Sequence, residues 1–138
     1  MAQPPADTAA PPSPAVSDSR RMAVRAKAAA ARLAECSQTQ IDTIVGAVAA
    51  AARTRAESFA QLAVEETGFG VVADKIQKNR FAAERVYEFI KPMRTVGVIR
   101  RDDERKVVEI AEPFGVVAAI VPSTNPTSTA IYKILISL

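Results

Sequence analysis

Apolar residues recur every three or four positions between about residue 17 and residue 91, which predicts a run of helices. The first helix spans about Ser17–Cys36 and is rich in alanine. The second spans about Ser37–Thr67 and opens with a Ser-x-x-Gln capping box formed by Ser37 and Gln40. Gly68 is expected to end it, since Gly is the usual residue just past a helix. The third spans about Val71–Lys91, and Pro92 ends it.

The period then changes to two, which predicts a β-hairpin over residues 95–111. Residues 95–100 and 106–111 alternate apolar and polar side chains around an Asp-Asp-Glu turn, so we expect one buried face and one wet face. Two strands alone are marginally stable in water. We therefore expect the hairpin to lie on another surface, such as that of a partner subunit.

A change from strand to helix follows at residues 113–138. Gly115–Val121 is a β-branched apolar run between two prolines, the pattern of a fully buried strand. Asn125 is a suitable N-cap for a helix that starts at Pro126. A strand, a tight loop and a capped helix form the opening of a βαβ unit, and ligands bind at the carboxyl ends of such strands. The predicted fold class is therefore α/β.

The last helix and the strand before it are both unfinished. The helix ends in the apolar run Ile134–Leu138 without a capping residue. A parallel strand also needs a partner after its crossover, and this chain supplies none. We expect residues 1–16 to be a disordered, Pro- and Ala-rich tail and residues 17–138 to be the amino-terminal part of a larger protein.

Composition excludes several kinds of function. The net charge is +3, and basic residues are interleaved with acidic ones, which argues against nucleic-acid binding. The chain has neither a membrane-spanning run nor a signal-peptide pattern, so a cytoplasmic protein is expected. It has no histidine and one cysteine, Cys36, which excludes His-based catalysis and a multi-cysteine metal site within these residues.

Two segments carry a resemblance to a known family. Glu65–Asn79, with the sequence EETGFGVVADKIQKN, closely resembles a segment of coenzyme A-acylating aldehyde dehydrogenases. Glu112–Ile131 resembles the first nucleotide-domain strand and loop of the same subfamily, whose mark is Pro-x-x-Asn-Pro. Phe81–Tyr87 and Thr95–Ile99, with Lys91, are similar to the members that act on sulfoacetaldehyde. The resemblance implies a Rossmann-like cofactor domain, of which this chain holds the first strand, loop and helix.

The resemblance also implies a reaction. Enzymes of this kind oxidise an aldehyde with NAD or NADP and transfer the acyl group to coenzyme A. A cysteine thiolate attacks the aldehyde, hydride passes to the nicotinamide, and coenzyme A resolves the resulting thioester. In the family this cysteine lies far downstream of the residues matched here, so we expect this chain alone to be inactive. The resemblance implies NAD or NADP as cofactor, coenzyme A and a small aldehyde as substrates, and a homo-oligomer.

The loop before the last helix is the predicted cofactor-side site. The resemblance assigns cofactor contacts to Val121, Pro122, Ser123, Thr124, Asn125 and Pro126. It also implies a hydrogen-bond donor to the oxyanion, for which both Thr124 and Asn125 are candidates. Aligning the two prolines places Thr124 where the wider superfamily keeps its asparagine. An ordinary helix cap at Asn125 is the plainer alternative.

Other candidates have plainer structural explanations. Cys36 follows a helix carboxyl terminus, and Glu35 precedes it, which disfavours a thiolate. Lys75, Lys78 and Lys91 could meet coenzyme A phosphates, but solvated helix faces explain them more simply. No catalytic residue and no metal ligand is predicted in this chain. The alternatives to an enzyme segment are a small non-catalytic helical interaction module and an inactive truncated product.

Overall fold

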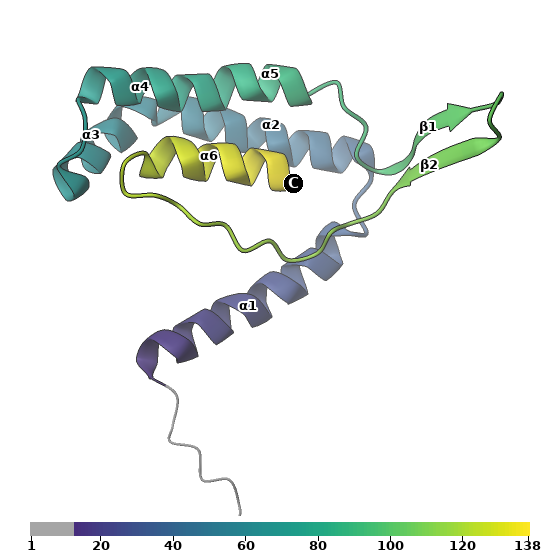
Figure 1. Ribbon diagram of the computed structural model, residues 1–138, viewed down its shortest axis with the longest axis horizontal. Coiled ribbons are helices and arrows are strands. Elements are labelled where there is room, and N and C mark those ends of the chain that lie inside the picture. The colour runs from purple at the N-terminus through teal and green to yellow at the C-terminus, as the bar shows by residue number, and fades with distance from the viewer. Residues whose placement is uncertain (1–12) are drawn as a thin grey trace, which may run out of the picture.

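A computed structural model describes residues 13–138 of the chain and shows a layer of helices with a hairpin projecting from one end (Figure 1). The elements in chain order are α1 Pro14–Leu33, α2 Gln38–Thr54, α3 Ala56–Thr67, α4 Val72–Arg80, the π-helical segment η1 Phe81–Val86, α5 Tyr87–Ile90, β1 Gly97–Asp102, β2 Val107–Ala111 and α6 Pro126–Ser137.

Helix α1 lies apart from the other helices and buries none of its residues (Figure 1). It begins earlier than predicted, because the Ser13 hydroxyl accepts a hydrogen bond from the backbone N–H of Val16 and Pro14 fills the first turn. The predicted tail therefore extends too far at its carboxyl end. Its residues 1–12 lie outside the described residues.

The single helix predicted for Ser37–Thr67 is two helices, α2 and α3. Its start is confirmed, since the side chains of Ser37 and Gln40 form the reciprocal capping box. Its end is confirmed too, because Gly68 adopts a left-handed conformation with φ of 68°. The break comes at Arg55, whose φ and ψ are −102° and 10°. Alanines on both sides of Arg55 are buried, so packing rather than helix propensity decides this turn.

The third predicted helix is confirmed as a continuous run of α4, η1 and α5. Its middle turns widen into a π-helix, a feature that occurs often at functional sites. Ala83 in this segment is fully buried. The core between α2, η1 and α6 combines small and large side chains, which are Ile41, Val45, Ala49, Ala52, Ala82, Ala83, Ile131 and Leu135. Alanines allow the helices to approach closely, and Leu135 fills the space between them.

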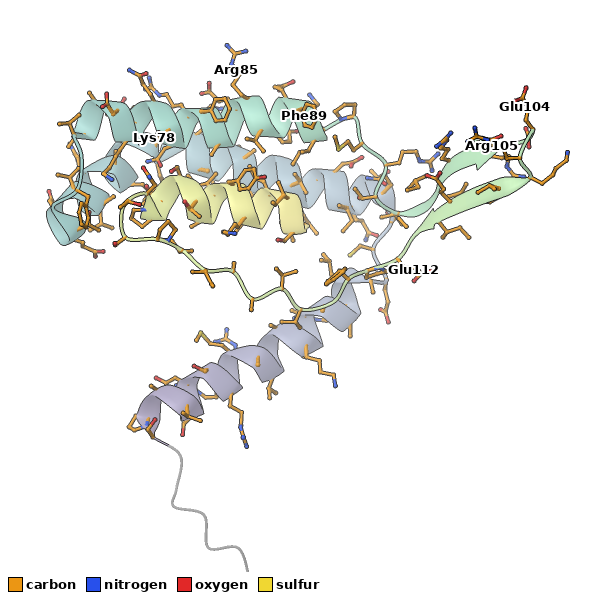
Figure 2. All side chains as sticks on the ribbon, in the orientation of Figure 1. Lys78, Arg85, Phe89, Glu104, Arg105 and Glu112 are labelled. Carbon is orange, nitrogen blue, oxygen red and sulfur yellow. The ribbon has the colours of Figure 1, made fainter. Side chains whose placement is uncertain are left out.

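The hairpin is confirmed, and the surface expected to cover one of its faces stays a prediction. Strands β1 and β2 pair antiparallel from Gly97 opposite Ala111 to Asp102 opposite Val107, with an irregularity between Val98 and Arg100. Almost every strand residue is exposed, because the hairpin extends away from the helices and, within residues 13–138, β1 and β2 pair only with each other (Figure 1). Glu104 and Arg105 lie at its far end, as expected for a solvated turn (Figure 2).

The strand predicted at Gly115–Val121 does not form among the described residues. The segment is extended but has no strand beside it, and the only sheet within residues 13–138 is the two-stranded hairpin. Its apolar side chains are consequently exposed, Ile120 to 85%. The segment runs from the hairpin past α1 to the start of α6 (Figure 1). The prediction of a buried strand is therefore wrong for this structure, since burial of a parallel strand requires neighbours on both sides.

None of the helices in the described part of the chain has the length and apolar character needed to cross a membrane.

Candidate functional site

The predicted cofactor-side loop connects the exposed extended segment to α6. Residues 121–124 are exposed, and Asn125 and Pro126 are half-buried. Pro126 is the first residue of α6, as predicted, and the carbonyl of Asn125 accepts the N–H of Thr129. The loop therefore presents hydroxyl and carboxamide groups on a turn whose carboxyl end is fixed by the helix.

Asn125 occupies the N-cap position, but its side chain makes no cap hydrogen bond. Its Oδ1 instead accepts a hydrogen bond from the Lys78 ammonium on α4, at 3.0 Å. The expected capping role is therefore wrong. A charge-assisted bond to an ammonium is stronger than a bond to a backbone N–H, which explains why the side chain turns to α4.

Lys75 also holds the loop. Its Nζ donates to the backbone carbonyl of Thr124 at 2.8 Å, and the residue is only 4% exposed. Gly70 lies against the Lys75 stem, since a Cβ on Gly70 would lie 3.5 Å from Cε of Lys75. The prediction of a solvated lysine on a helix face is therefore wrong for Lys75, although it holds for the exposed Lys78.

Asn79 connects three elements from a fully buried position. Its Nδ2 donates to the carbonyl of Ala56 at the start of α3, at 2.9 Å. Its Oδ1 accepts from the hydroxyl of Thr127 in the first turn of α6, also at 2.9 Å. Both ends of the amide are thus satisfied, as a buried polar side chain requires. This side chain therefore links the start of α6 to both α3 and α4.

The two segments that carry the family resemblance therefore meet in space. Lys75, Lys78 and Asn79 have the i, i+3, i+4 spacing that places them on one face of α4. Their partners Thr124, Asn125 and Thr127 lie in the loop and the first turn of α6. The sequence offered one signal for this contact, namely three polar side chains on the helix face next to Ile76.

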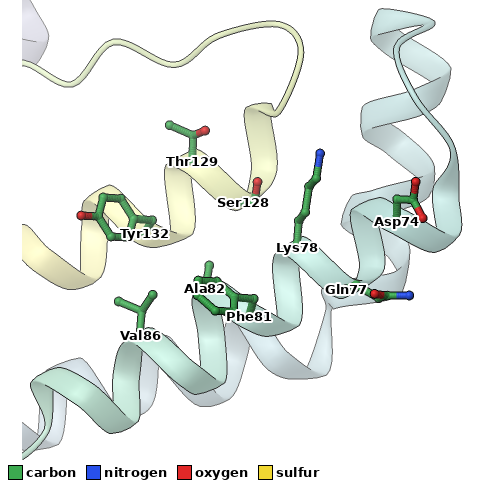
Figure 3. Close-up of a pocket in the computed structure, with 9 residues that line it drawn as sticks. All are labelled: Asp74, Gln77, Lys78, Phe81, Ala82, Val86, Ser128, Thr129 and Tyr132. Atoms are coloured by element: carbon green, nitrogen blue, oxygen red, sulfur yellow. The ribbon is translucent and has the colours of Figure 1, made fainter.

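A groove of about 680 Å³ lies next to this contact, between α4, η1 and α6 (Figure 3). Lys78 extends from α4 toward the turn that precedes α6, and Phe81 and Val86 line the apolar floor from η1 (Figure 3). Ser128, Thr129 and Tyr132 line the opposite wall from α6. The groove is thus largely apolar with polar groups at the end near the loop.

The remaining candidates keep structural explanations. Cys36 is half-buried, and its thiol donates to the carbonyl of Arg32 at 3.6 Å. Asp102, the first acid of the Asp-Asp-Glu turn, pairs with Arg100 and accepts the N–H of Arg105, so it has a structural role in the hairpin. Lys91 lies 5.7 Å from the ring centre of Tyr87. Within residues 13–138 no cluster of His, Cys, Asp and Glu could hold a metal ion.

Comparison with known proteins identifies the family. The model of the "Aldehyde dehydrogenase family" matches residues 8–138, almost the whole sequence. The chain belongs to the aldehyde dehydrogenase family. This membership confirms the resemblance that the two motif segments indicated.

Named relatives point to the acylating branch. The chain is 45% identical over 123 residues to the bifunctional aldehyde-alcohol dehydrogenase AdhE of Escherichia coli. The aligned region covers 89% of this chain and 14% of that protein. It is 43% identical to the sulfoacetaldehyde dehydrogenase (acylating) of Cupriavidus necator, over 83% of this chain and 24% of that protein. The chain therefore spans a small part of these relatives.

Solved structures agree with this assignment. The crystal structure of an acetylating aldehyde dehydrogenase from Geobacillus thermoglucosidasius matches with a TM-score of 0.86 and 54% identity, over 88% of this chain and 27% of that one. This likeness confirms the predicted fold as part of an aldehyde dehydrogenase. The roles assigned to Val121–Pro126 remain predictions.

Proposed function

We propose that this chain is the amino-terminal part of an NAD(P)-dependent aldehyde dehydrogenase that transfers the acyl group to coenzyme A. The observation that carries the proposal is the high identity, over most of this chain, to proteins named as acetylating or acylating dehydrogenases. Family membership favours this function over the alternative of a small helical interaction module.

The loop Val121–Pro126 is suited to the cofactor side of such a site. Its exposed part carries the hydroxyls of Ser123 and Thr124 and is anchored at its far end by α6. Hydroxyl and carboxamide groups on a fixed turn match the polar surface of a dinucleotide. A bound nicotinamide supplies the hydride acceptor. The chain's own task is to bind and orient, because its one thiol lies in the α1–α2 connection and bonds to a backbone carbonyl.

The direct test uses the protein expressed from its complete coding sequence. Acetaldehyde or sulfoacetaldehyde is supplied with NAD or NADP, with and without coenzyme A, and acyl-coenzyme A is measured by mass spectrometry alongside reduced nicotinamide. We expect acyl-coenzyme A to form only when all three substrates are present. Release of the free acid regardless of coenzyme A would contradict the acylating assignment, and the assay also identifies the preferred aldehyde and nucleotide.

The 138-residue chain gives the matched control. It has no cysteine other than Cys36, so we expect neither acyl-coenzyme A nor reduced nicotinamide from it. Turnover by this chain alone would show that a nucleophile is present within these residues.

Subunit association is the second part of the proposal. The hairpin exposes Val98, Val108 and Ile110 on a projection that the helices do not cover. Exposed apolar side chains on a paired ribbon favour docking on another subunit, so we propose a homo-oligomer assembled through residues 95–111. The predicted cytoplasmic location stays a prediction.

A further inference from the structure

The contact between Lys78 and Asn125 fixes the orientation of a carboxamide whose two ends differ in chemistry. An ammonium has only donors, so the atom that it meets at 3.0 Å must be the carboxamide oxygen Oδ1. The amide NH₂ group is therefore turned away from Lys78. Within residues 13–138 the structure records no hydrogen bond from this group. Asn125 thus presents a donor in a fixed orientation.

The neighbouring residue is held differently. Lys75 binds the backbone carbonyl of Thr124 and fixes the main chain there. Among residues 13–138 the structure records no hydrogen bond that orients the Thr124 hydroxyl, and the residue is exposed. Of the two candidates for an oxyanion donor, only Asn125 has its side chain oriented by a charged partner. A donor works best when it is oriented before the reaction begins.

Burial of Lys75 adds an independent observation. The residue is 4% exposed, and none of the ion pairs recorded among the described residues includes it. Burying a cation without an anionic partner costs free energy, and an apolar side chain of similar length would avoid that cost. Its recorded Nζ contact is the carbonyl of the candidate loop.

We infer that Lys78 is a positioning residue that orients the Asn125 carboxamide as the oxyanion donor, with Lys75 fixing the loop backbone beside it. This inference rests on the proposed function. Lys78 does not touch the substrate. It acts by holding Oδ1, and its positive charge polarises the amide so that the NH₂ group becomes a stronger donor.

The test uses the full-length enzyme and substitutions of exposed residues, because these leave the fold intact. Lys78→Met removes the ammonium but keeps the stem. Arg80→Met is the matched control, since Arg80 lies on the same helix, carries the same charge and pairs with Glu57 rather than with the loop. Lys78→Arg tests rescue by another cation.

We expect Lys78→Met to lower kcat by about tenfold to a hundredfold with the KM values for aldehyde and nucleotide nearly unchanged, because the interaction acts in the transition state. Arg80→Met should retain the wild-type kcat, and Lys78→Arg should recover part of the loss. A Lys78→Met enzyme with kcat within about twofold of wild type would overturn the inference, since misplacing a reacting group costs more than that.

A double-substitution cycle identifies the group through which Lys78 acts. If Lys78 works through Asn125, adding Lys78→Met to Asn125→Ala should change kcat by less than about twofold. Adding it to Thr124→Val should cause the full loss. The reverse pattern would assign the oxyanion donor to Thr124 and overturn the orientation argument.

A second readout separates this inference from the proposed function. The side-chain NH₂ signals of Asn125 are followed by NMR in wild type, Lys78→Met and Arg80→Met. Faster hydrogen exchange of this group only in Lys78→Met supports positioning of the carboxamide, and equal exchange in all three overturns it, whether or not the enzyme is active. An inactive wild-type enzyme would refute the proposed function, and an active wild type with an unaffected Lys78→Met would refute only the role of Lys78.

Discussion

The helical layer buries its apolar side chains, whereas the hairpin and the segment that follows it expose similar ones. In the layer, Ile131 and Leu135 of α6 are buried against α2 and η1. In the hairpin and the segment after it, Ile110 and Ile120 are 58% and 85% exposed. Both regions have a clear apolar pattern in the sequence. The difference is that α6 finds its partners within the described residues and residues 97–121 do not.

This difference shows what an apolar pattern determines. It specifies which side chains favour burial, because burial of apolar surface is favourable wherever it occurs. It does not specify which surface covers them. The same comparison holds for polar groups. Asn79 finds its hydrogen-bond partners on α3 and α6, whereas Asp102 in the hairpin turn finds its partner, the N–H of Arg105, three residues away.

The largest effect is expected within the helical layer. Leu135→Ala in the 138-residue chain should lower the free energy of unfolding by about 2–5 kcal/mol, because the residue is almost fully buried and leaves a cavity. Ile136→Ala, on the exposed side of the same helix, should cost less than about 1 kcal/mol. Urea unfolding followed by circular dichroism measures both, and equal losses would show that the burial pattern of α6 is wrong.

The buried amide should rank next. Asn79→Ala removes the partner of both the Ala56 carbonyl and the Thr127 hydroxyl, so we expect a loss of about 2–4 kcal/mol. Gln77→Ala on the exposed face of α4 is the control and should change stability by less than about 0.5 kcal/mol. If Asn79→Ala were as mild as its control, α6 would be held mainly by apolar contacts.

The capping box at the start of α2 should contribute less to the free energy of unfolding than the buried residues do. Ser37→Ala removes the side-chain half of the capping box and should cost about 1 kcal/mol. Ser37→Thr keeps an acceptor at that position and should recover most of the stability. Thermal unfolding monitored by circular dichroism compares the two, and an equal loss in both would point to a steric cause instead of a lost cap.

The hairpin should give the smallest effect on stability and a separate effect on assembly. Ile110→Lys should change the unfolding free energy of the 138-residue chain by less than about 0.5 kcal/mol, because its side chain is exposed there. In the full-length protein the added charge should weaken subunit association, measured by light scattering after gel filtration. Val24→Lys, at an exposed apolar residue of α1 outside residues 95–111, is the control. An unchanged oligomer with Ile110→Lys would refute the proposed role of the hairpin.

Several features of the fold could be predicted from the sequence because they depend on neighbours along the chain. The capping box at Ser37, the left-handed Gly68, the stop at Pro92 and the start of α6 at Pro126 are all confirmed. The family itself could be predicted from two segments, because they are long and specific.

The site could be predicted only in part. The sequence indicated the loop Val121–Pro126 as the candidate, with capping as the alternative for Asn125 and a solvated helix face as the simpler explanation of Lys75. The side-chain cap at Asn125 and the solvent exposure of Lys75 are wrong for the same reason. The partners lie 47 and 49 residues apart in the chain, and residue spacing carries no information about contacts at that separation.

The sequence by itself therefore determined the helices, the hairpin and the family, since these follow from local backbone preferences and from motifs read in order. Only the tertiary structure showed that Lys75 of α4 binds the loop before α6 and that the helix predicted for Ser37–Thr67 breaks at Arg55. It also showed that Gly115–Val121 has no sheet to join among the described residues. The physical reason is that a side chain or strand obtains its hydrogen-bond partners and its covering surface from the segments that pack against it. Packing in three dimensions determines which segments these are.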